Sequence, residues 1–470
     1  MSPQQVDTII RGGTIVTSSS AFEASVAIQG ETIVGVGPEA TLPPGKRVID
    51  ATGRYVLPGA IDVHTHFGGN DDWRIGPQAA AYGGLTTVIN FISAGPDNDL
   101  PQAIDRRRQE ADRDSVVDFG FHFILRNDPQ SLRGVPRAVE MGVSTFKMFM
   151  AYPKWGSIWC PDDFIAEAME IIGDSGGMAQ VHCESGLVID YLEQRQIREE
   201  RVRPSDFLAS HPDWTEEESA NRALKMAELT GCPVYVVHLS AHLALERIKE
   251  SQAAGQRAWT ETCPQYLLLS DAEMERWGPF AKIGPPLRSA DGMNQEAMWR
   301  GSRDGFISCV ASDHAPFDRE QKEAGWKNIF FDGEGKTIPY GAPSVETMVP
   351  LMYSEGVVKR GLPITWMARV LSENPARLFG LFPRKGVIQA GSDADILIID
   401  PNREKTIRGE EQHVTAGYTL YEDWKISGWP VMSLLRGRVL LNDGKLELTP
   451  GAGAYLARKG PLPPIAGPAG

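Results

Sequence analysis

The sequence has 470 residues, which is enough for one large barrel domain with a smaller partner domain. Its formal net charge of -14 would repel phosphate groups, so we expect no nucleic acid and no membrane surface as a partner. The five cysteines form no Cys-x-x-Cys pair, no apolar run reaches the roughly 20 residues of a membrane helix, and no signal peptide is readable at the start. These features predict a cytoplasmic protein with free thiols.

Short β-branched segments separated by glycine-rich turns occupy both ends of the chain. They lie at residues 6–15, 25–28, 32–36, 395–399, 431–435 and 439–441. Segments of this kind are typical of antiparallel strands, so we predict one β-sandwich domain built from residues 1–57 and 384–450. Two unrelated β units are the alternative. Residues 451–470, rich in Gly, Pro and Ala, form a tail that either packs against a neighbouring subunit or stays disordered.

Between these ends, eight apolar runs alternate with charged, helical stretches. The runs cover residues 56–63, 86–92, 117–125, 143–150, 179–181, 234–237, 258–262 and 306–311. Alternation of this kind is typical of parallel βα units, and eight units predict a closed (β/α)₈ barrel over residues 58–383. An open doubly wound sheet is the competing architecture, but it should carry a glycine-rich phosphate loop after an early strand, and none is present.

Histidine or aspartate stands at the ends of four of these runs. His64 and His66 lie two residues apart at the end of the first run. Because successive side chains of a strand point to opposite faces, these two point the same way. His182, His238 and Asp313 close or follow three later runs. An isolated pair of histidines could equally be one packed and one exposed side chain. Because the strand ends of a barrel surround a single mouth, the five residues together favour a metal site.

Lys147 lies in an otherwise strongly apolar run, Thr145 to Met150. Burial in such a strand would lower the pKa of its amine and make it nucleophilic. A neutral amine can capture carbon dioxide as a carbamate, which has two oxygens and can bridge two cations. The alternative is a lysine inside the barrel that is paired with a carboxylate.

These residues belong to a set of motifs that resembles the amidohydrolase superfamily, and most closely its dihydropyrimidinase/hydantoinase group. The matching stretches are Gly59–His66, Ala79–Thr87, Phe146–Tyr152, Val181–Glu184, Val237–Ser240, Pro285–Arg288, Ser312–Pro316, Asn374–Ala376, Lys385–Gly386 and Gly391–Asp395. Together they are highly specific, and the resemblance covers nearly the whole chain.

The resemblance implies a site for two divalent metal ions, most readily Zn²⁺. His64, His66 and Asp313 would hold the buried ion. His182 and His238 would hold the more exposed one. Lys147, carboxylated to N6-carboxylysine, would bridge the two ions, and a hydroxide would complete the bridge. The resemblance also suggests a homotetramer.

The implied reaction is the hydrolytic opening of a cyclic amide, a dihydropyrimidine or a 5-substituted hydantoin, to an N-carbamoyl amino acid. The bridging hydroxide would attack the ring carbonyl, Tyr152 would stabilise the oxyanion, and Asp313 would carry the proton to the leaving nitrogen. The alternatives are an allantoinase or another hydrolase of cyclic amides or imides. A non-catalytic scaffold relative is the alternative from a different class.

Gly284 and Tyr340 are expected to contact the substrate. In the resembled group these positions often hold Ser and Asn, and the contact is made largely through the backbone. We therefore expect the shape of the pocket, and with it the identity of the substrate, to be where this chain differs from the group.

Overall fold

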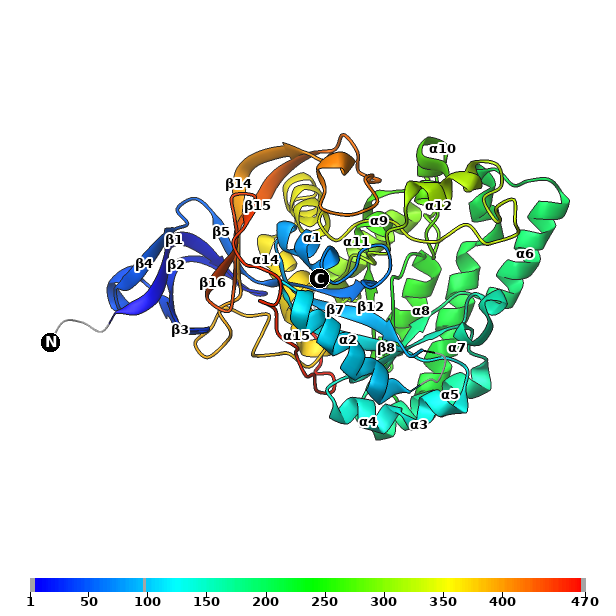
Figure 1. Ribbon diagram of the computed structural model, residues 1–470, viewed down its shortest axis with the longest axis horizontal. Helices are drawn as coiled ribbons and strands as arrows, with labels where there is room; N and C mark the ends of the chain where they lie inside the picture. The colour runs from blue at the N-terminus through cyan, green and yellow to red at the C-terminus, as the bar shows by residue number, and fades with distance from the viewer. Residues whose placement is uncertain (1–4, 96–98, 466–470) are drawn as a thin grey trace.

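The computed structural model describes residues 5–95 and 99–465. Two sheets organise these residues: an eight-stranded sheet from the middle of the chain and a nine-stranded sheet from its two ends (Figure 1). The two sheets lie side by side along the long axis of the molecule. In the described part of the chain, no helix combines the length and the apolar character that crossing a membrane would require.

The eight-stranded sheet is the predicted barrel. Its strands are β6 (Ala60–Thr65), β7 (Leu85–Ser93), β8 (Asp118–Ile124), β9 (Thr145–Phe149), β10 (Met178–His182), β11 (Val234–Val236), β12 (Ala258–Thr262) and β13 (Cys309–Val310). They pair in chain order, and each neighbouring pair is parallel. His66 donates its backbone N–H to the carbonyl of His314 at 3.0 Å, which brings the last strand back to the first. The barrel is therefore nearly closed, and the predicted fold class is confirmed.

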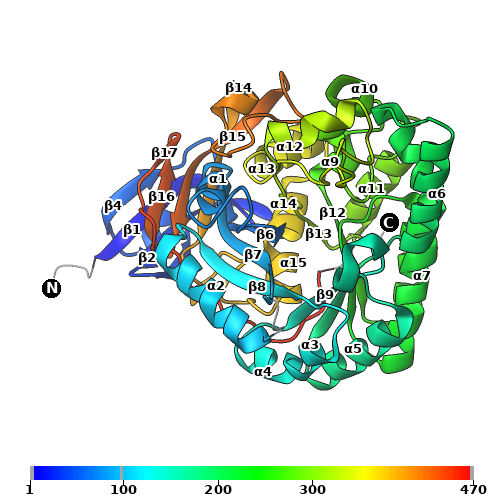
Figure 2. The same cartoon turned by 45° about the vertical axis from the view of Figure 1, so that its right-hand side comes forward.

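Helices cover the outside of the barrel (Figure 2). They are α1 (Gly76–Tyr82), α2 (Leu100–Asp114), α3 (Pro129–Arg133), α4 (Val135–Glu140), α5 (Asp162–Asp174), α6 (Gly186–Arg198), α7 (Asp213–Thr230), α8 (His242–Ala253), α9 (Pro264–Leu268), α10 (Glu273–Trp277), α11 (Met293–Asp304), α12 (Arg319–Glu323), α13 (Met348–Leu351), α14 (Ile364–Ala368) and α15 (Asn374–Leu378). Outward strand residues such as Phe146 and Met148 pack into the core beneath the helices, and inward residues such as Val63, Phe91 and Tyr235 fill the barrel.

The first apolar run of the sequence does not form one strand. Its opening residues form β5 (Tyr55–Pro58), which belongs to the sheet from the chain ends, and β6 of the barrel begins at Ala60. Gly59 makes the passage between them, donating its N–H to the carbonyl of Asp395 at 2.8 Å. A Cβ at Gly59 would lie 2.2 Å from the Thr86 hydroxyl, so only glycine fits this crossing. The prediction of a single strand over 56–63 was therefore wrong.

Both ends of the chain build the second sheet. Its strands are β1 (Val6–Val16), β2 (Ala21–Gln29), β3 (Thr32–Gly37), β4 (Gly45–Asp50), β5, β14 (Ile396–Thr406), β15 (Lys425–Leu435), β16 (Arg438–Asn442) and β17 (Lys445–Leu446). Strands β5 and β14 pair across the two halves, and one apolar core that includes Ile10, Val56 and Ile396 joins them. The prediction of one unit from both ends is confirmed, but not its purely antiparallel pairing, because β1 runs parallel to β4 and β5. The domain boundaries after residues 57 and 383 stay a prediction.

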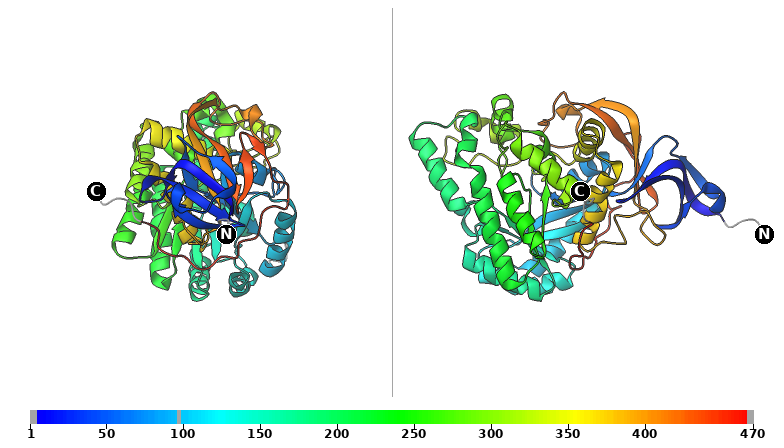
Figure 3. Two further views of the ribbon diagram at one scale, coloured as in Figure 1. Left: turned by 90° about the vertical axis from the view of Figure 1, so that its left-hand side faces the viewer. Right: turned by 180° about the vertical axis from the view of Figure 1, so that it is seen from behind.

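The tail packs against its own barrel as far as it is described, to residue 465 (Figure 3). Tyr455 pairs with Phe119 at the start of β8, and the buried Arg458 donates to the carbonyl of Phe121 and, at 2.7 Å, to the Thr145 hydroxyl. These strand starts lie at the opposite end of the barrel from the strand ends. The sequence predicted a tail that packs against a neighbouring subunit or stays disordered, and neither alternative describes residues 451–465. Residues 466–470 lie outside the described chain.

Candidate active site

A cavity of about 760 Å³ opens at the ends of the barrel strands. Eight of the nine sequence-predicted site residues line it: His66, Lys147, Tyr152, His182, His238, Gly284, Asp313 and Tyr340. The ninth, His64, is fully buried, with its ring Nε2 3.1 Å from the Asp313 carboxylate. Residues from β6, β9, β10 and the segments after β11 and β13 thus meet at one place, as the barrel geometry predicts.

His64, His66 and Asp313 form the tightest group. The Nε2 atoms of the two rings lie 3.1 and 3.4 Å from the same Asp313 oxygen, Oδ1. One possible ligand atom from each residue lies within 4.8 Å of the others, which is close enough to hold one metal ion. Burial would raise the pKa of Asp313, but the two histidine rings outweigh burial and hold it well below its ordinary value. The carboxylate is therefore ionised, as a metal ligand must be.

Lys147 points into the barrel from β9, between the outward Phe146 and Met148. Its Nζ lies 3.2 Å from His64 Nε2 and 4.4 Å from the centre of the Phe91 ring. No carboxylate in the described part of the chain is within ion-pair distance of this amine, so the alternative of a paired lysine has no support there. Burial lowers the pKa of Lys147 to about 8. A useful fraction of the amine is then neutral near physiological pH.

His182 ends β10, and His238 follows β11 by two residues; their ring centres lie 4.5 Å apart. Burial lowers the pKa of His182 to about 3 and that of His238 well below its ordinary value. Both rings are therefore neutral, the form that binds metals. His182 Nε2 contacts the Glu184 carboxylate at 2.8 Å, while the buried Nδ1 of His238 has no partner among the described residues.

The donors at the mouth fit a pair of divalent cations. They are neutral imidazoles, an ionised carboxylate and an amine that can become a carbamate, and imidazole and oxygen ligands suit zinc and several other ions. A second acidic group in the described chain, Asp118, Asp393 and Asp395, is different. The Lys385 ammonium lies within 3.0 Å of all three carboxylates, so this group is an ion-pair cluster.

The site also concentrates backbone strain. Tyr152, His238 and Asp313 have φ values of 61°, 39° and 51°, in the left-handed region that L-residues seldom adopt. They are three of the seven such non-glycine residues in the described chain. Strained conformations of this kind persist where the surroundings fix them, and they gather at functional sites.

Gly284 and Tyr340 lie beside Tyr152. The Tyr152 ring stacks on Trp155 with centres 4.2 Å apart, and its centre is 5.3 Å from that of Tyr340. A Cβ at Gly284 would lie 2.2 Å from the Tyr152 hydroxyl oxygen and 3.1 Å from the Tyr340 ring. Tyr340 is fixed from behind, because its hydroxyl donates to Glu193 at 3.2 Å and its ring covers the Lys282 amine at 4.1 Å.

Sequence reasoning missed Glu261, whose carboxylate contacts the His64 ring. Its signal was an acidic residue two positions after Trp259 in a short buried strand, which places both side chains on the inward face. The His314 ring contacts Asp71 at 2.9 Å and accepts from the N–H of Ser344 at 3.1 Å.

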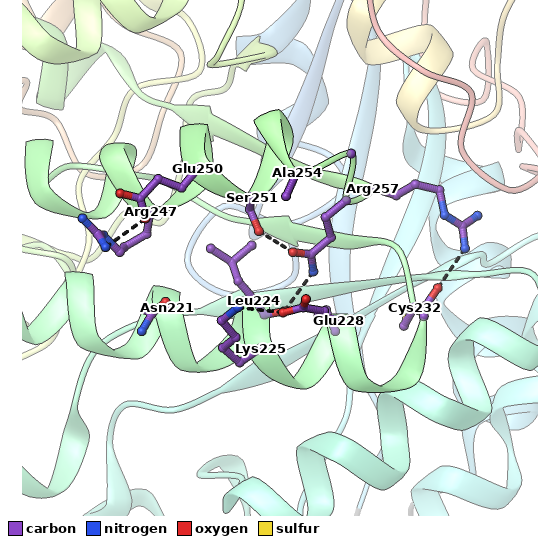
Figure 4. Close-up of a pocket in the computed structure, with 14 residues that line it drawn as sticks. Asn221, Leu224, Lys225, Glu228, Cys232, Arg247, Glu250, Ser251, Ala254 and Arg257 are labelled. Carbon is purple, nitrogen blue, oxygen red and sulfur yellow. Dashed lines mark hydrogen bonds and ion pairs between the residues drawn. The ribbon is translucent and has the colours of Figure 1, made fainter.

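A separate hollow of about 380 Å³ lies between α7 and α8 (Figure 4). None of the predicted site residues lines it. Four of its five charged side chains pair with one another, Arg247 with Glu250 at 2.9 Å and Lys225 with Glu228 at 2.7 Å, and Arg257 donates to the carbonyl of Gly231. The barrel mouth is therefore the candidate active site.

Known proteins resemble this chain along nearly its whole length. Residues 55–440 match the family described as "Amidohydrolase family". A D-hydantoinase of Geobacillus stearothermophilus is 36% identical over 464 residues, with 96% of each chain covered. A D-phenylhydantoinase of Escherichia coli is 33% identical over 468 residues, covering 97% of this chain and 99% of its own. The crystal structure of a dihydropyrimidinase from Brevibacillus agri superposes with a TM-score of 0.91 at 34% identity, covering 97% of this chain and all of that one.

Proposed function

This chain belongs to the amidohydrolase family, and from that premise we propose that it opens a 5-substituted hydantoin or a dihydropyrimidine to an N-carbamoyl amino acid. Relatives named hydantoinases, 33–36% identical over nearly the full chain, make it a cyclic amidohydrolase. The observation that carries the proposal is the meeting of six donor side chains at the barrel mouth. They are His64, His66, Lys147, His182, His238 and Asp313.

In this proposal the six side chains hold two divalent cations, by preference zinc. His64, His66 and Asp313 would hold the buried ion, and His182 and His238 would hold the other. Such a pair, when bound, lowers the pKa of a water and polarises a carbonyl. The neutral amine of Lys147 can attack carbon dioxide and lose a proton, and the resulting carbamate would supply oxygen ligands to the ions. The low pKa of Lys147, about 8, supports this step.

The protein side chains then direct the chemistry. Asp313 accepts the proton of the attacking water and delivers it to the leaving ring nitrogen. The Tyr152 hydroxyl donates a hydrogen bond to the carbonyl oxygen as that atom gains negative charge. Burial holds the pKa of Tyr152 well above its ordinary value, so this hydroxyl remains a donor.

Gly284 and Tyr340 shape the place of the substrate ring beside Tyr152. The remaining cavity wall includes Phe149 and Phe317, so an apolar ring substituent is accommodated there. The cytoplasmic location and the homotetramer that the sequence predicts belong to this proposal as well.

The test replaces the proposed proton carrier. An Asp313→Ala protein, reconstituted with zinc and checked for metal content, should lose at least about 10²-fold in turnover of dihydrouracil or a 5-substituted hydantoin, because no other group carries the proton. The parent, assayed beside it, should open at least one of the two rings. A fully metallated Asp313→Ala protein that turns over at the parent rate would contradict the role of Asp313.

A further inference from the structure

Glu261 is a buried carboxylate with three partners, one on β6 and two on β11 or just after it. It contacts the ring Nδ1 of His64, accepts the backbone N–H of His238 at 3.3 Å, and accepts the hydroxyl of Tyr235 at 3.0 Å. Its side chain is fully buried. No other carboxylate in the described part of the chain contacts both His64 and the backbone of His238.

The position of Glu261 follows from strand alternation. In β12, Trp259 packs in the apolar core inside the barrel, so Glu261, two residues later, points the same way but nearer the mouth. A carboxylate taken out of water into such surroundings destabilises the fold unless hydrogen bonds compensate for the lost hydration. Its three partners are therefore required for the strand to hold an acidic residue here.

The contact with His64 selects the tautomer of that ring. A carboxylate beside Nδ1 keeps the proton on Nδ1 and leaves the Nε2 lone pair free. That Nε2 faces the candidate metal site, 3.1 Å from Asp313 and 3.2 Å from the Lys147 amine. Glu261 therefore fixes the orientation of a proposed ligand of the buried ion and which of its ring nitrogens faces that ion.

The contact with His238 fixes a strained backbone. His238 has a φ of 39°, and its N–H donates to the same Glu261 oxygen, Oε1, that contacts His64. This turn directs the His238 ring toward His182, with centres 4.5 Å apart. One oxygen atom thus joins a proposed ligand of the buried ion to a proposed ligand of the exposed one.

We infer that Glu261 is a positioning residue for both metal ions: through His64 and His238 it sets the geometry of the two sites together. This inference rests on the proposed function. Carboxylates that orient metal-bound histidines typically change metal affinity by roughly 10- to 100-fold when removed. Removal of Glu261 should lower the affinity for both ions, whereas a residue that oriented one histidine would affect one ion.

The experiment measures metal affinity in the full-length protein by competition with a chelator, for the parent, Glu261→Gln and Glu261→Ala. The amide oxygen of Gln can still accept from His64 Nδ1, so we expect Glu261→Gln to lose less affinity than Glu261→Ala. Glu261→Ala should lose roughly 10- to 100-fold for both ions. The absorption spectrum of the cobalt-substituted protein reports ligand geometry directly and should change in Glu261→Ala.

Glu216→Gln is the matched control. Glu216 is an equally buried carboxylate that accepts the N–H of Ser240 at 2.9 Å and the Arg288 guanidinium at 2.6 Å, and it has no contact with a proposed ligand in the described structure. It should lose stability but keep the parent metal affinity and cobalt spectrum. If Glu261→Ala bound both ions as tightly as the parent, or if Glu216→Gln lost as much metal affinity as Glu261→Ala, the inference about Glu261 would be overturned and the proposed function would stand. A parent protein that binds no divalent ion would instead overturn the proposed function.

Discussion

Two neighbouring tyrosines leave no room for a side chain at position 284. A Cβ there would come within 2.2 Å of the Tyr152 hydroxyl oxygen and 3.1 Å of the Tyr340 ring. Tyr152 has little room to withdraw, because Trp155 stacks on its ring. Tyr340 is fixed by its hydrogen bond to Glu193. The position of the Tyr152 hydroxyl, the proposed oxyanion donor, thus depends on the missing Cβ at Gly284 as well as on its contacts.

Gly284→Ala should therefore displace the Tyr152 hydroxyl and impair catalysis more than folding. We expect kcat for ring opening to fall roughly 100-fold, the lower end of what the loss of one oxyanion donor costs. Steady-state kinetics on the zinc-loaded protein measure this loss.

Gly69→Ala is the control from the same cavity wall, because a Cβ at Gly69 would meet nothing within 4 Å. It should keep the parent kcat. Equal kcat values for the two alanine variants would show that Gly284 does not set the place of Tyr152.

At the scale of the element, strands β9 and β12 each place one residue at the site and its neighbours in the core. In β9, Phe146 and Met148 pack under the helices while Lys147 points to the mouth. In β12, Trp259 fills the barrel and Glu261 contacts His64. The period of two therefore explains how a strongly apolar strand can hold a single charged group in a fixed direction.

The tail is an element of a different kind, because it has no regular structure of its own and yet completes the barrel floor. Leu456 is almost fully buried within the apolar core inside the barrel, and its N–H donates to the carbonyl of Phe119 at 2.7 Å. Gly453 lies so close to Val117 that a Cβ would come within 2.0 Å of its carbonyl oxygen. Because Gly453 has no side chain, the backbone of the tail can approach the barrel closely at this point.

Leu456→Ala should lower the free energy of unfolding by about 2–5 kcal/mol, as expected for a buried leucine that leaves a cavity. Leu462→Ala, in the same tail but with its side chain 43% exposed, should change it by less than about 0.5 kcal/mol. Urea unfolding of both variants beside the parent measures the difference. If Leu456→Ala were as stable as the parent and as Leu462→Ala, the tail would not stabilise the barrel.

At the scale of the whole molecule, a buried charge cluster joins the barrel to the sheet from the chain ends. The Lys385 ammonium contacts Asp118 of β8 at 2.6 Å and Asp395, just before β14, at 2.5 Å. Arg436 reaches Asp118 from β15's end at 3.2 Å. Burial would lower the pKa of Lys385, but the carboxylates outweigh it and raise it. The Lys385 ammonium therefore stays charged, and its ion pairs hold the two parts together.

The sequence was sufficient to predict this architecture where a local pattern repeats. Eight apolar runs predicted eight strands, and the alternation at His64 and His66, with His182, His238 and Asp313 at other strand ends, predicted which side chains meet. These predictions needed only strand periodicity and the geometry of a barrel, which do not depend on the details of packing.

The features that were missed depend on contacts between distant residues. Glu261 meets His64 across 197 positions, and Arg458 reaches Thr145 across 313. No local pattern marks such partners. The split at Gly59 was missed for a similar reason, since Val56 before it and Ile61 after it are both buried, but in different cores.

The most direct test of the central claim is a zinc titration of the metal-free protein, with ring opening of dihydrouracil and of a 5-substituted hydantoin followed at each step. The account predicts no turnover without metal, and hydrolysis of at least one ring that rises until two ions are bound per chain. Undiminished hydrolysis by the metal-free protein, or no hydrolysis of either ring with two ions bound, would contradict it.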